Sequence, residues 1–263
     1  MKIKINDPDK CENCNVKSCK FLTVAKTKSD FIRLTSETSI CPTSAIDENG
    51  PSESDLKNKS IGGSNCVECG LCARFCAHEN LVIEDCSLKA DKFECLDAIQ
   101  LKAVTSLYLS LLFDFSANTN RNQSLPFDCY VSTCSGMEAF VEIDAGDDSL
   151  ECLRRILGDI ITYSQSRIIT HGIVVLSTFP KSGSRDMFSV ISKLKDFPTT
   201  RNIKIYITTF SILRMLCAAG VNKADDFHTF LFDCTTESDE RMYLKRLKQV
   251  ITRMRSNEQY NEG

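Results

Sequence analysis

Four cysteines between residues 66 and 76 constrain the fold of this chain more than any other feature. They form the run Cys66-Val-Glu-Cys69-Gly-Leu-Cys72-Ala-Arg-Phe-Cys76, with the spacing C-x2-C-x2-C-x3-C. Three thiolates separated by two residues in a tight loop can reach one common centre, whereas the fourth, a turn later, points elsewhere. Gly70 suits such a loop because glycine adopts the backbone angles that a close wrap requires. A second group of cysteines should therefore face this run.

Such a group precedes it, as Cys11-Glu-Asn-Cys14-Asn-Val-Lys-Ser-Cys19 followed by Cys41-Pro42. The chain has 15 cysteines in all, an odd total. Because the N-terminal residues lack the apolar core of a signal peptide, we expect a cytoplasmic location, where thiols stay reduced. In that compartment the surplus indicates metal or cluster ligation rather than disulfides.

The two groups resemble, in motif and in order, the ferredoxins that carry two [4Fe-4S] clusters, and the resemblance covers residues 1–90. It implies an α+β ferredoxin-like domain and two sets of cluster ligands. One set is Cys11, Cys14, Cys19 and Cys76, and the other is Cys66, Cys69, Cys72 and Cys41. The chain departs from the family in the x4 gap before Cys19, in residues 20–40, which intervene before Cys41, and in the lack of a proline after Cys76.

Two zinc knuckles are the alternative for these eight cysteines, since C-x2-C pairs also make tetrahedral thiolate sites. We expect the other seven to be buried core residues, because a buried thiol behaves as a small apolar group. They are Cys86, Cys95, Cys129, Cys134, Cys152, Cys217 and Cys234. His78 stands two residues after Cys76, the last of these eight cysteines, and could hydrogen-bond to a cluster.

The length of 263 residues predicts two domains, residues 1–90 and residues 91–263. We expect residues 51–64 to be a surface loop within the first. The formal charge of -3 gives no global basic field, and no apolar run reaches the roughly 18 residues of a membrane span. We therefore expect no membrane partner. The motifs of nucleotide-binding loops and serine hydrolases are missing from the sequence.

The second domain shows alternating strand and helix patterns, which predict an α/β mixed sheet. Helices are expected at residues 94–115, 149–164, 185–196, 212–219 and 238–255. Strands are expected at residues 127–133, 139–144, 168–177, 203–209 and 229–232, the first two forming a hairpin through Ser135-Gly136-Met137. The last helix carries a basic face, which either contacts phosphates or is simply solvated.

Acidic residues gather at the predicted hairpin, where Asp128 opens one strand and Glu142 and Asp144 lie on one face of the next. Such carboxylates suit Mg²⁺ or Mn²⁺, which can activate water for phosphodiester cleavage. The alternative is a solvated hairpin end, with Asp147 and Asp148 at the start of a helix.

The order helix, hairpin with D…E-x-D, helix and strand resembles the restriction-endonuclease-like superfamily, PD-(D/E)xK, over residues 94–210. The resemblance implies that Asp128 and Glu142 bind a metal and that Asp144 stands where the family usually has lysine. Catalytic residues would then be Asp128, Glu142 and Asp144.

Three functions remain open. The first is a protein with two [4Fe-4S] clusters that acts in electron transfer or redox sensing with a redox partner protein. The second is a Mg²⁺- or Mn²⁺-dependent DNA nuclease with structural or regulatory clusters. The third is an adaptor that binds DNA or protein without catalysis.

Overall fold

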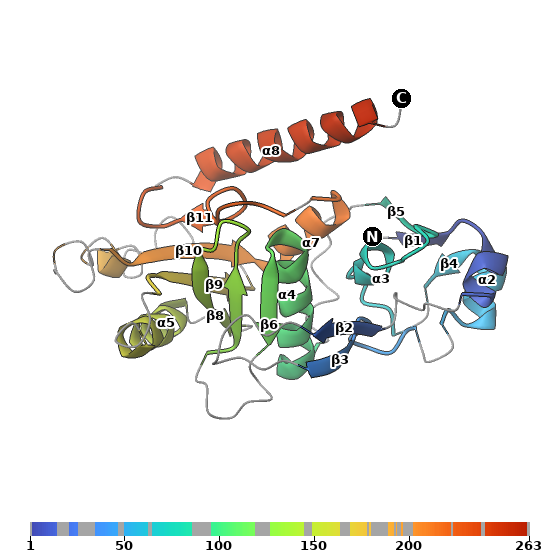
Figure 1. Ribbon diagram of the computed structural model, residues 1–263, viewed down its shortest axis with the longest axis horizontal. Helices are drawn as coiled ribbons and strands as arrows, with labels where there is room; N and C mark the ends of the chain where they lie inside the picture. Colours follow the sequence, from blue (N-terminus) through green and yellow to red (C-terminus); the bar gives the residue numbers. More distant parts are fainter. Residues whose placement is uncertain are drawn as a thin grey trace. The chain divides into compact units, whose positions relative to one another are not determined.

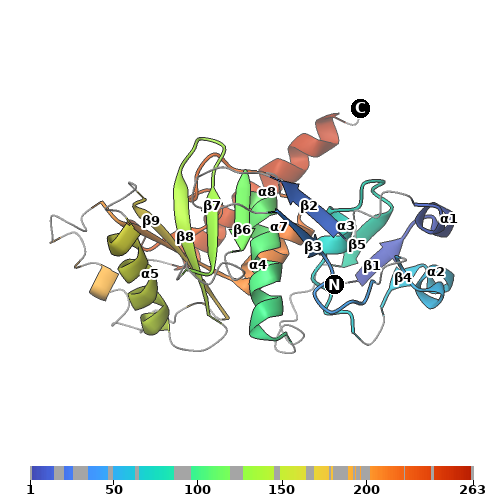
Figure 2. The same ribbon diagram turned by 60° about the horizontal axis from the view of Figure 1, so that its bottom comes forward.

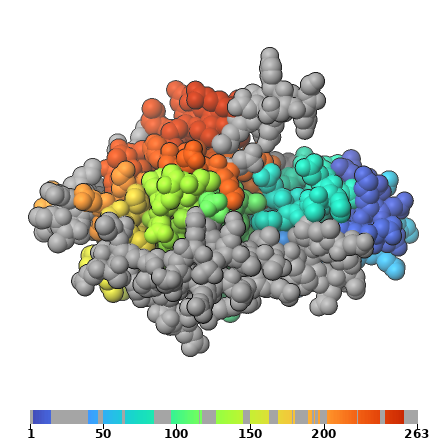
Figure 3. Space-filling model, viewed as in Figure 1, coloured from blue at the N-terminus to red at the C-terminus, as the bar shows by residue number. Residues whose placement is uncertain are grey.

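The chain is described from a computed structural model (Figure 1), and Figure 3 draws its atoms in the same view. The structure describes residues 2–14, 21–25, 35–46, 50–62, 65–85, 96–118, 127–144, 149–163, 169–177, 179, 189–191, 193, 196, 202–221, 223–237 and 240–261. None of the described helices is both long and apolar enough to cross a membrane.

The chain divides into two compact units. The first comprises Met1–Tyr108 and Arg214–Gly220, and the second comprises Leu109–Leu213 and Val221–Gly263. Two of the three dividing points fall inside helices and the third follows Gly220, whereas the sequence predicts one boundary near residue 90. The protein belongs to the α+β class, with a mixed sheet in the second unit and antiparallel sheets in the first.

The first unit contains short strands and helices. In chain order they are β1 (Lys2–Ile5), α1 (Pro8–Glu12), β2 (Phe21–Ala25), β3 (Thr35–Ser39), α2 (Glu53–Asn58), β4 (Ser60–Ile61), α3 (Leu71–Arg74) and β5 (Leu81–Asp85). Strand β1 is the middle of the antiparallel sheet β4-β1-β5, and β2 pairs with β3. Part of helix α4 (Ala98–Leu112) and part of α7 (Phe210–Ala218) complete this unit.

The core of the first unit is small and includes thiols. Ile3 and Ile5 of β1 are buried, whereas Lys4 between them is exposed, as the alternation of a strand requires. They pack with Ile46, Ile61, Cys72 and Leu81. Six partly buried side chains lie against this cluster, and four of them are the cysteines Cys11, Cys41, Cys66 and Cys76.

The predicted surface loop at residues 51–64 is wrong, since it contains helix α2 and strand β4. Ser52 caps α2: its hydroxyl accepts from the Asp55 amide, and the Asp55 carboxylate accepts from the Ser52 amide. This reciprocal pair satisfies two amides that the first turn leaves unpaired and so stabilises a helix of only six residues.

The second unit is built on a six-stranded sheet in the order β11-β10-β9-β8-β7-β6. The strands are β6 (Phe115–Asn118), β7 (Cys129–Ser132), β8 (Glu138–Asp144), β9 (His171–Leu176), β10 (Lys204–Thr209) and β11 (Phe232–Asp233). Strands β8, β9 and β10 are parallel to one another, and the other pairs are antiparallel. The predicted β7–β8 hairpin is confirmed, with Gly136 in its turn at φ 87°.

Helix α5 (Ser149–Tyr163) packs on β8 and β9, as Figure 2 shows. Its Leu153, Ile156 and Ile160 are fully buried, whereas Leu150 and Ile161, predicted on the same apolar side, are exposed. The close approach depends on Gly172 of β9, since a Cβ there would lie 2.7 Å from Cγ1 of Ile156.

The C-terminal helix α8 (Glu240–Asn261) begins beside β11 (Figure 1). The Tyr243 ring meets Phe232 edge-on at 5.5 Å, and its hydroxyl donates to the Phe230 backbone oxygen. The sequence predicts a strand at residues 229–232, but the strand in the structure, β11, starts only at Phe232. Strand β6 occupies residues where the sequence predicts a helix end and a polar loop. Most of the predicted helix at residues 185–196 lies outside the described residues.

Candidate functional site

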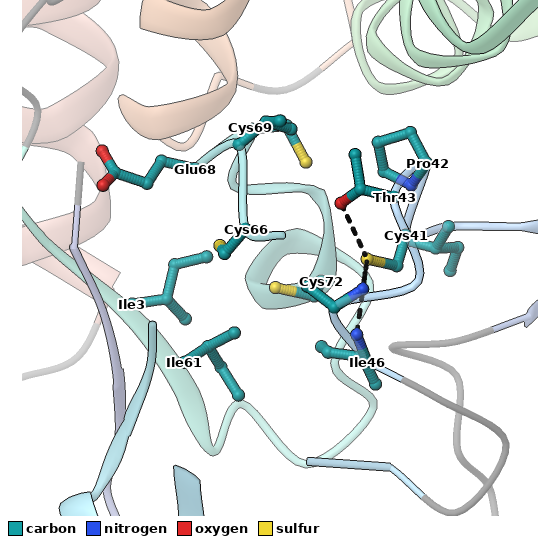
Figure 4. A pocket seen from close by; sticks show the side chains of 13 residues that line it. Ile3, Cys41, Pro42, Thr43, Ile46, Ile61, Cys66, Glu68, Cys69 and Cys72 are labelled. Carbon is teal, nitrogen blue, oxygen red and sulfur yellow. Dashed lines mark hydrogen bonds between the residues drawn. The ribbon is translucent and has the colours of Figure 1, made fainter. Parts of the chain in front are cut away.

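Four cysteines line one pocket of the first unit, three from one loop and one from an earlier part of the chain (Figure 4). They are Cys41, Cys66, Cys69 and Cys72, and about 290 Å³ of empty space lies between the lining atoms, counted to the open mouth. Apolar side chains, including those of Ile3, Ile46 and Ile61, complete the lining. The structure thus brings together the second predicted ligand set, including Cys41.

The loop that carries three of these cysteines turns through left-handed backbone conformations. Gly70 has φ 79° and begins α3, which places Cys72 on the first turn of the helix. Glu68 has φ 56°, although such values are uncommon for residues other than glycine. Strain of this kind persists where the surrounding structure enforces it, and it concentrates at binding sites. The loop is held in a wrapped form around its thiols.

Backbone amides point at these thiols. The amides of Ala45 and Ile46 donate to Sγ of Cys41 at 3.1 Å and 3.5 Å (Figure 4). Burial raises the pKa of Cys69 to about 12, while a hydrogen bond from the Leu71 amide acts in the opposite direction. A thiol in this setting loses its proton when a cation coordinates the sulfur.

Side chains of α4 and α7 hold the backbone of the same loop. The Tyr108 hydroxyl donates to the Cys69 backbone oxygen at 2.8 Å, and the Cys217 thiol lies 4.0 Å from that oxygen. Arg214, only 3 % exposed, donates from Nε to the Glu68 backbone oxygen at 3.1 Å. Its Nη2 also lies 3.6 Å from Oε2 of Glu68, so the arginine clamps both the backbone and the side chain.

A second pocket in the same unit is lined by Cys11, Cys14 and Cys76, and Lys10 and His78 also belong to its lining. About 330 Å³ of empty space lies between its lining atoms, counted to the open mouth. Three of the four cysteines in the first predicted ligand set therefore meet, including the distant Cys76. Cys19, the fourth, lies outside the described residues.

One amide side chain in this pocket bonds directly to a thiol. Nδ2 of Asn80 lies 3.0 Å from Sγ of Cys11 and 2.7 Å from the Asp7 backbone oxygen. Burial raises the pKa of Cys11, and the hydrogen bond from Asn80 acts in the opposite direction.

Both pockets fit [4Fe-4S] clusters in their donor chemistry. Each pocket is lined by thiols from both cysteine groups, and in each pocket an N–H group donates to a sulfur atom. Isoleucine side chains line the first pocket and present no polar atoms to water. The cysteines of such a cluster each bind a different iron, a wider arrangement than four ligands around one zinc ion. Within the part of the chain that the structure describes, no three His, Cys, Asp or Glu side chains converge on a position for a single metal ion.

The predicted acidic site lies in the second unit. Asp128 is 7 % exposed and Glu142 is 3 % exposed, so the interpretation of these two as a solvated hairpin end is wrong. The Asp128 amide donates to the Val141 backbone oxygen, and Oδ2 of Asp128 accepts from the Ile143 amide at 2.9 Å. This pairing sets Asp128 beside Glu142 across the two strands. Asp147 and Asp148 lie outside the described residues.

An arginine of α5 lies against these acids. Nε of Arg155 is 3.2 Å from Oε2 of Glu142, and its Nη2 is 3.9 Å from Oδ2 of Asp144. Glu142 and Asp144 therefore share a face, as predicted from their i, i+2 spacing. Burial and the neighbouring Asp128 raise the pKa of Glu142 to about 8, although Arg155 acts in the opposite direction. The predicted site for Mg²⁺ or Mn²⁺ stays a prediction.

Four of the seven other cysteines are buried as expected, namely Cys129, Cys152, Cys217 and Cys234. Cys134 is exposed in the β7–β8 turn, where the expectation of burial is wrong. Cys86 and Cys95 lie outside the described residues. On α8, Arg246 is not simply solvated, since it donates to the backbone oxygens of His228, Thr229 and Leu231.

Sequence reasoning missed four side chains that complete these sites: Asn80, Tyr108, Arg155 and Arg214. Arg155 had a signal, since it stands four residues before Asp159 on a helix whose other face is apolar. Arg214 also had one, as a lone cation in the apolar stretch Phe210-Ser-Ile-Leu-Arg-Met-Leu-Cys. Nothing in the sequence identifies the partners of either Asn80 or Tyr108. Comparison with protein-family models, with curated proteins and with solved structures found no match.

Proposed function

We propose that this chain is an iron–sulfur protein that binds two [4Fe-4S] clusters and acts in electron transfer or redox sensing. One observation carries the proposal: each pocket contains a cysteine from the other cysteine group. Cys41 joins Cys66, Cys69 and Cys72, and Cys76 joins Cys11 and Cys14. This exchange of one ligand is what the spacing C-x2-C-x2-C-x3-C implies when two clusters are bound.

A bound [4Fe-4S] cluster accepts or releases a single electron. The chain's own residues would supply four thiolates for one cluster and at least three for the other. The Ala45, Ile46 and Leu71 amides would stabilise negative charge on sulfur. Ile3, Ile46 and Ile61 would keep water from one side of the first pocket.

The finer fold belongs to the same proposal. We propose a ferredoxin-like arrangement for residues 1–90, which the antiparallel sheet β4-β1-β5 supports. For the second unit we propose a restriction-endonuclease-like arrangement. The element order α4, hairpin β7–β8, α5 and β9 supports it.

Purification without oxygen, followed by analysis of iron and sulfide, tests the cluster proposal. We expect about eight of each per chain, with a visible band that dithionite bleaches and a paramagnetic resonance signal in the reduced protein. Zinc without sulfide would contradict the proposal and favour two zinc knuckles.

A second candidate function, Mg²⁺- or Mn²⁺-dependent DNA cleavage, is favoured by the buried pair Asp128 and Glu142. It predicts cleavage that Asp128→Asn and Glu142→Gln abolish and that Glu138→Gln, at the other end of β8, leaves intact. DNA binding without cleavage in the wild type and in all three variants would favour an adaptor instead.

A further inference from the structure

The amide of Asn80 is held in one orientation by the backbone around it. Its Oδ1 accepts a hydrogen bond from the Asp7 amide at 2.9 Å, and its Nδ2 donates one hydrogen to the Asp7 backbone oxygen at 2.7 Å. The acceptor bond fixes which end of the side chain is oxygen and which is nitrogen. The second Nδ2 hydrogen then remains for Sγ of Cys11, at 3.0 Å.

The backbone of Asn80 is also hydrogen-bonded, and the residue is shielded from solvent. Its backbone oxygen accepts from the Asn6 amide at 3.0 Å, and the residue is only 5 % exposed. Little water can therefore replace the Asn80 donor. The donor is preorganised at Cys11 and does not need to move when charge on the sulfur changes.

We infer that Asn80 raises the reduction potential of the cluster held by Cys11, Cys14 and Cys76. It acts through the hydrogen bond that its amide donates to Sγ of Cys11. The inference rests on the proposed function. Adding an electron increases the negative charge that the thiolates carry, and a fixed N–H donor stabilises the more negative form more strongly. The electron comes from a one-electron reductant, here dithionite, and the amide keeps its proton throughout.

The two pockets differ in a way that makes this testable. Sγ of Cys41 accepts from the backbone amides of Ala45 and Ile46 and lies 3.9 Å from the Thr43 hydroxyl, and a substitution at Asn80 leaves all three contacts in place. Cys11 receives a bond from a side chain, which a substitution removes. A change at Asn80 should therefore move one potential and leave the other.

The experiment is a redox titration of the intact protein, followed by paramagnetic resonance, for the wild type and Asn80→Leu. We expect one midpoint potential to become more negative by up to about 59 mV, a tenfold change in the ratio of reduced to oxidised cluster. The matched control is Asn13→Leu, whose amide donates to the Asp9 backbone oxygen at 2.9 Å. We expect it to leave both potentials unchanged.

Asn80→Leu also removes the bonds to Asp7 and could prevent cluster loading. Asn80→Asp is the second variant, because it keeps an oxygen for the Asp7 amide but loses the donor to sulfur. Its carboxylate adds a negative charge beside the cluster, so it serves the nitrogen measurement below and not the comparison of potentials. A third measurement needs no substitution: pulsed resonance on reduced wild-type protein labelled with ¹⁵N-asparagine should show a nitrogen coupling. Asn80→Asp should abolish that coupling.

Each result has one meaning. Normal iron and sulfide with unchanged potentials in Asn80→Leu, or a labelled wild type without the coupling, would overturn the role of Asn80 alone. A wild type without iron and sulfide would instead overturn the proposed function on which the inference rests.

Discussion

Arg214 donates from Nε to the backbone oxygen of Glu68 at 3.1 Å, although 146 positions separate the two residues in the chain. Their side chains also form an ion pair at 3.6 Å. Glu68 stands between Cys66 and Cys69, so the arginine holds the cysteine loop in its wrapped conformation.

We expect Arg214→Met to destabilise the protein by about 1–3 kcal/mol, because it removes the buried hydrogen bond to the Glu68 backbone oxygen and the ion pair with the partly exposed Glu68 carboxylate. Urea denaturation under anaerobic conditions measures this. The matched control is Lys223→Met, which breaks the half-exposed pair with Asp114 and should cost about 1 kcal/mol or less. Equal losses in the two variants would contradict the clamp.

Removal of Cys41 tests the ligand set that the first pocket brings together. Cys41→Ala should lower the iron content from about eight to about four per chain, because one cluster loses a ligand. Cys134→Ala should keep the wild-type content, since Cys134 is exposed in the β7–β8 turn. Unchanged iron in Cys41→Ala would remove Cys41 from the set.

Gly172→Ala should destabilise the second unit by roughly 1–3 kcal/mol, the usual cost of overpacking a core. The added Cβ would lie 2.7 Å from Ile156 Cγ1 and 3.0 Å from Ile160 Cδ1. Gly158→Ala, on helix α5 itself, meets no atom within 4 Å and should stabilise by up to about 1 kcal/mol. Calorimetric melting of both variants checks the opposite signs.

His171 should make the stability of the protein depend on pH. Its ring lies parallel to that of Tyr206 at 6.1 Å, and burial, with Lys204 adding to the effect, lowers its pKa below 6.5. The unfolded chain then binds a proton more readily than the folded one. Stability should therefore fall as pH drops below about 6.5.

His171→Phe should remove this part of the pH dependence while keeping an aromatic ring against Tyr206. Melting temperatures of the wild type and the variant between pH 5 and pH 8 measure the difference. Parallel curves over that range would show that His171 does not titrate in the expected way.

Local patterns predicted much of the second unit. Gly136 between two apolar runs indicated the β7–β8 hairpin, and the β-branched run at residues 168–177 indicated a strand covered on both faces, which the structure places at His171–Leu176. Strand β6 escaped prediction because its residues follow a helix directly and are stabilised by pairing with β7, which only tertiary structure supplies. Helix α2 had a readable cap in Ser52 and Asp55, but the polar composition of its surroundings favoured a loop.

The sites were predictable only in part. The resemblance to two-cluster ferredoxins implied which thiols belong together, including Cys41 and Cys76. The sequence did not indicate the roles of Asn80 or Arg214. Their hydrogen bonds join residues 69 and 146 positions apart, and contacts over such separations produce no repeating pattern in a single sequence. The burial of Glu142 was also hidden, since an acid two residues from another on a strand is usually solvated.

Arg214 lies late in the chain, so its contacts with the cysteine loop form only after most of the protein has been synthesised. Cys76 is the last cysteine of the two pockets, yet Arg214, which holds the cysteine loop, follows 138 positions later. At translation rates of about 5–20 residues per second, this interval lasts roughly 7–28 s. For that time the nascent chain presents Cys66, Cys69 and Cys72 on a loop that Arg214 has not yet secured. In the proposed iron–sulfur protein, cluster insertion and thiol oxidation would compete for these thiols during the same interval.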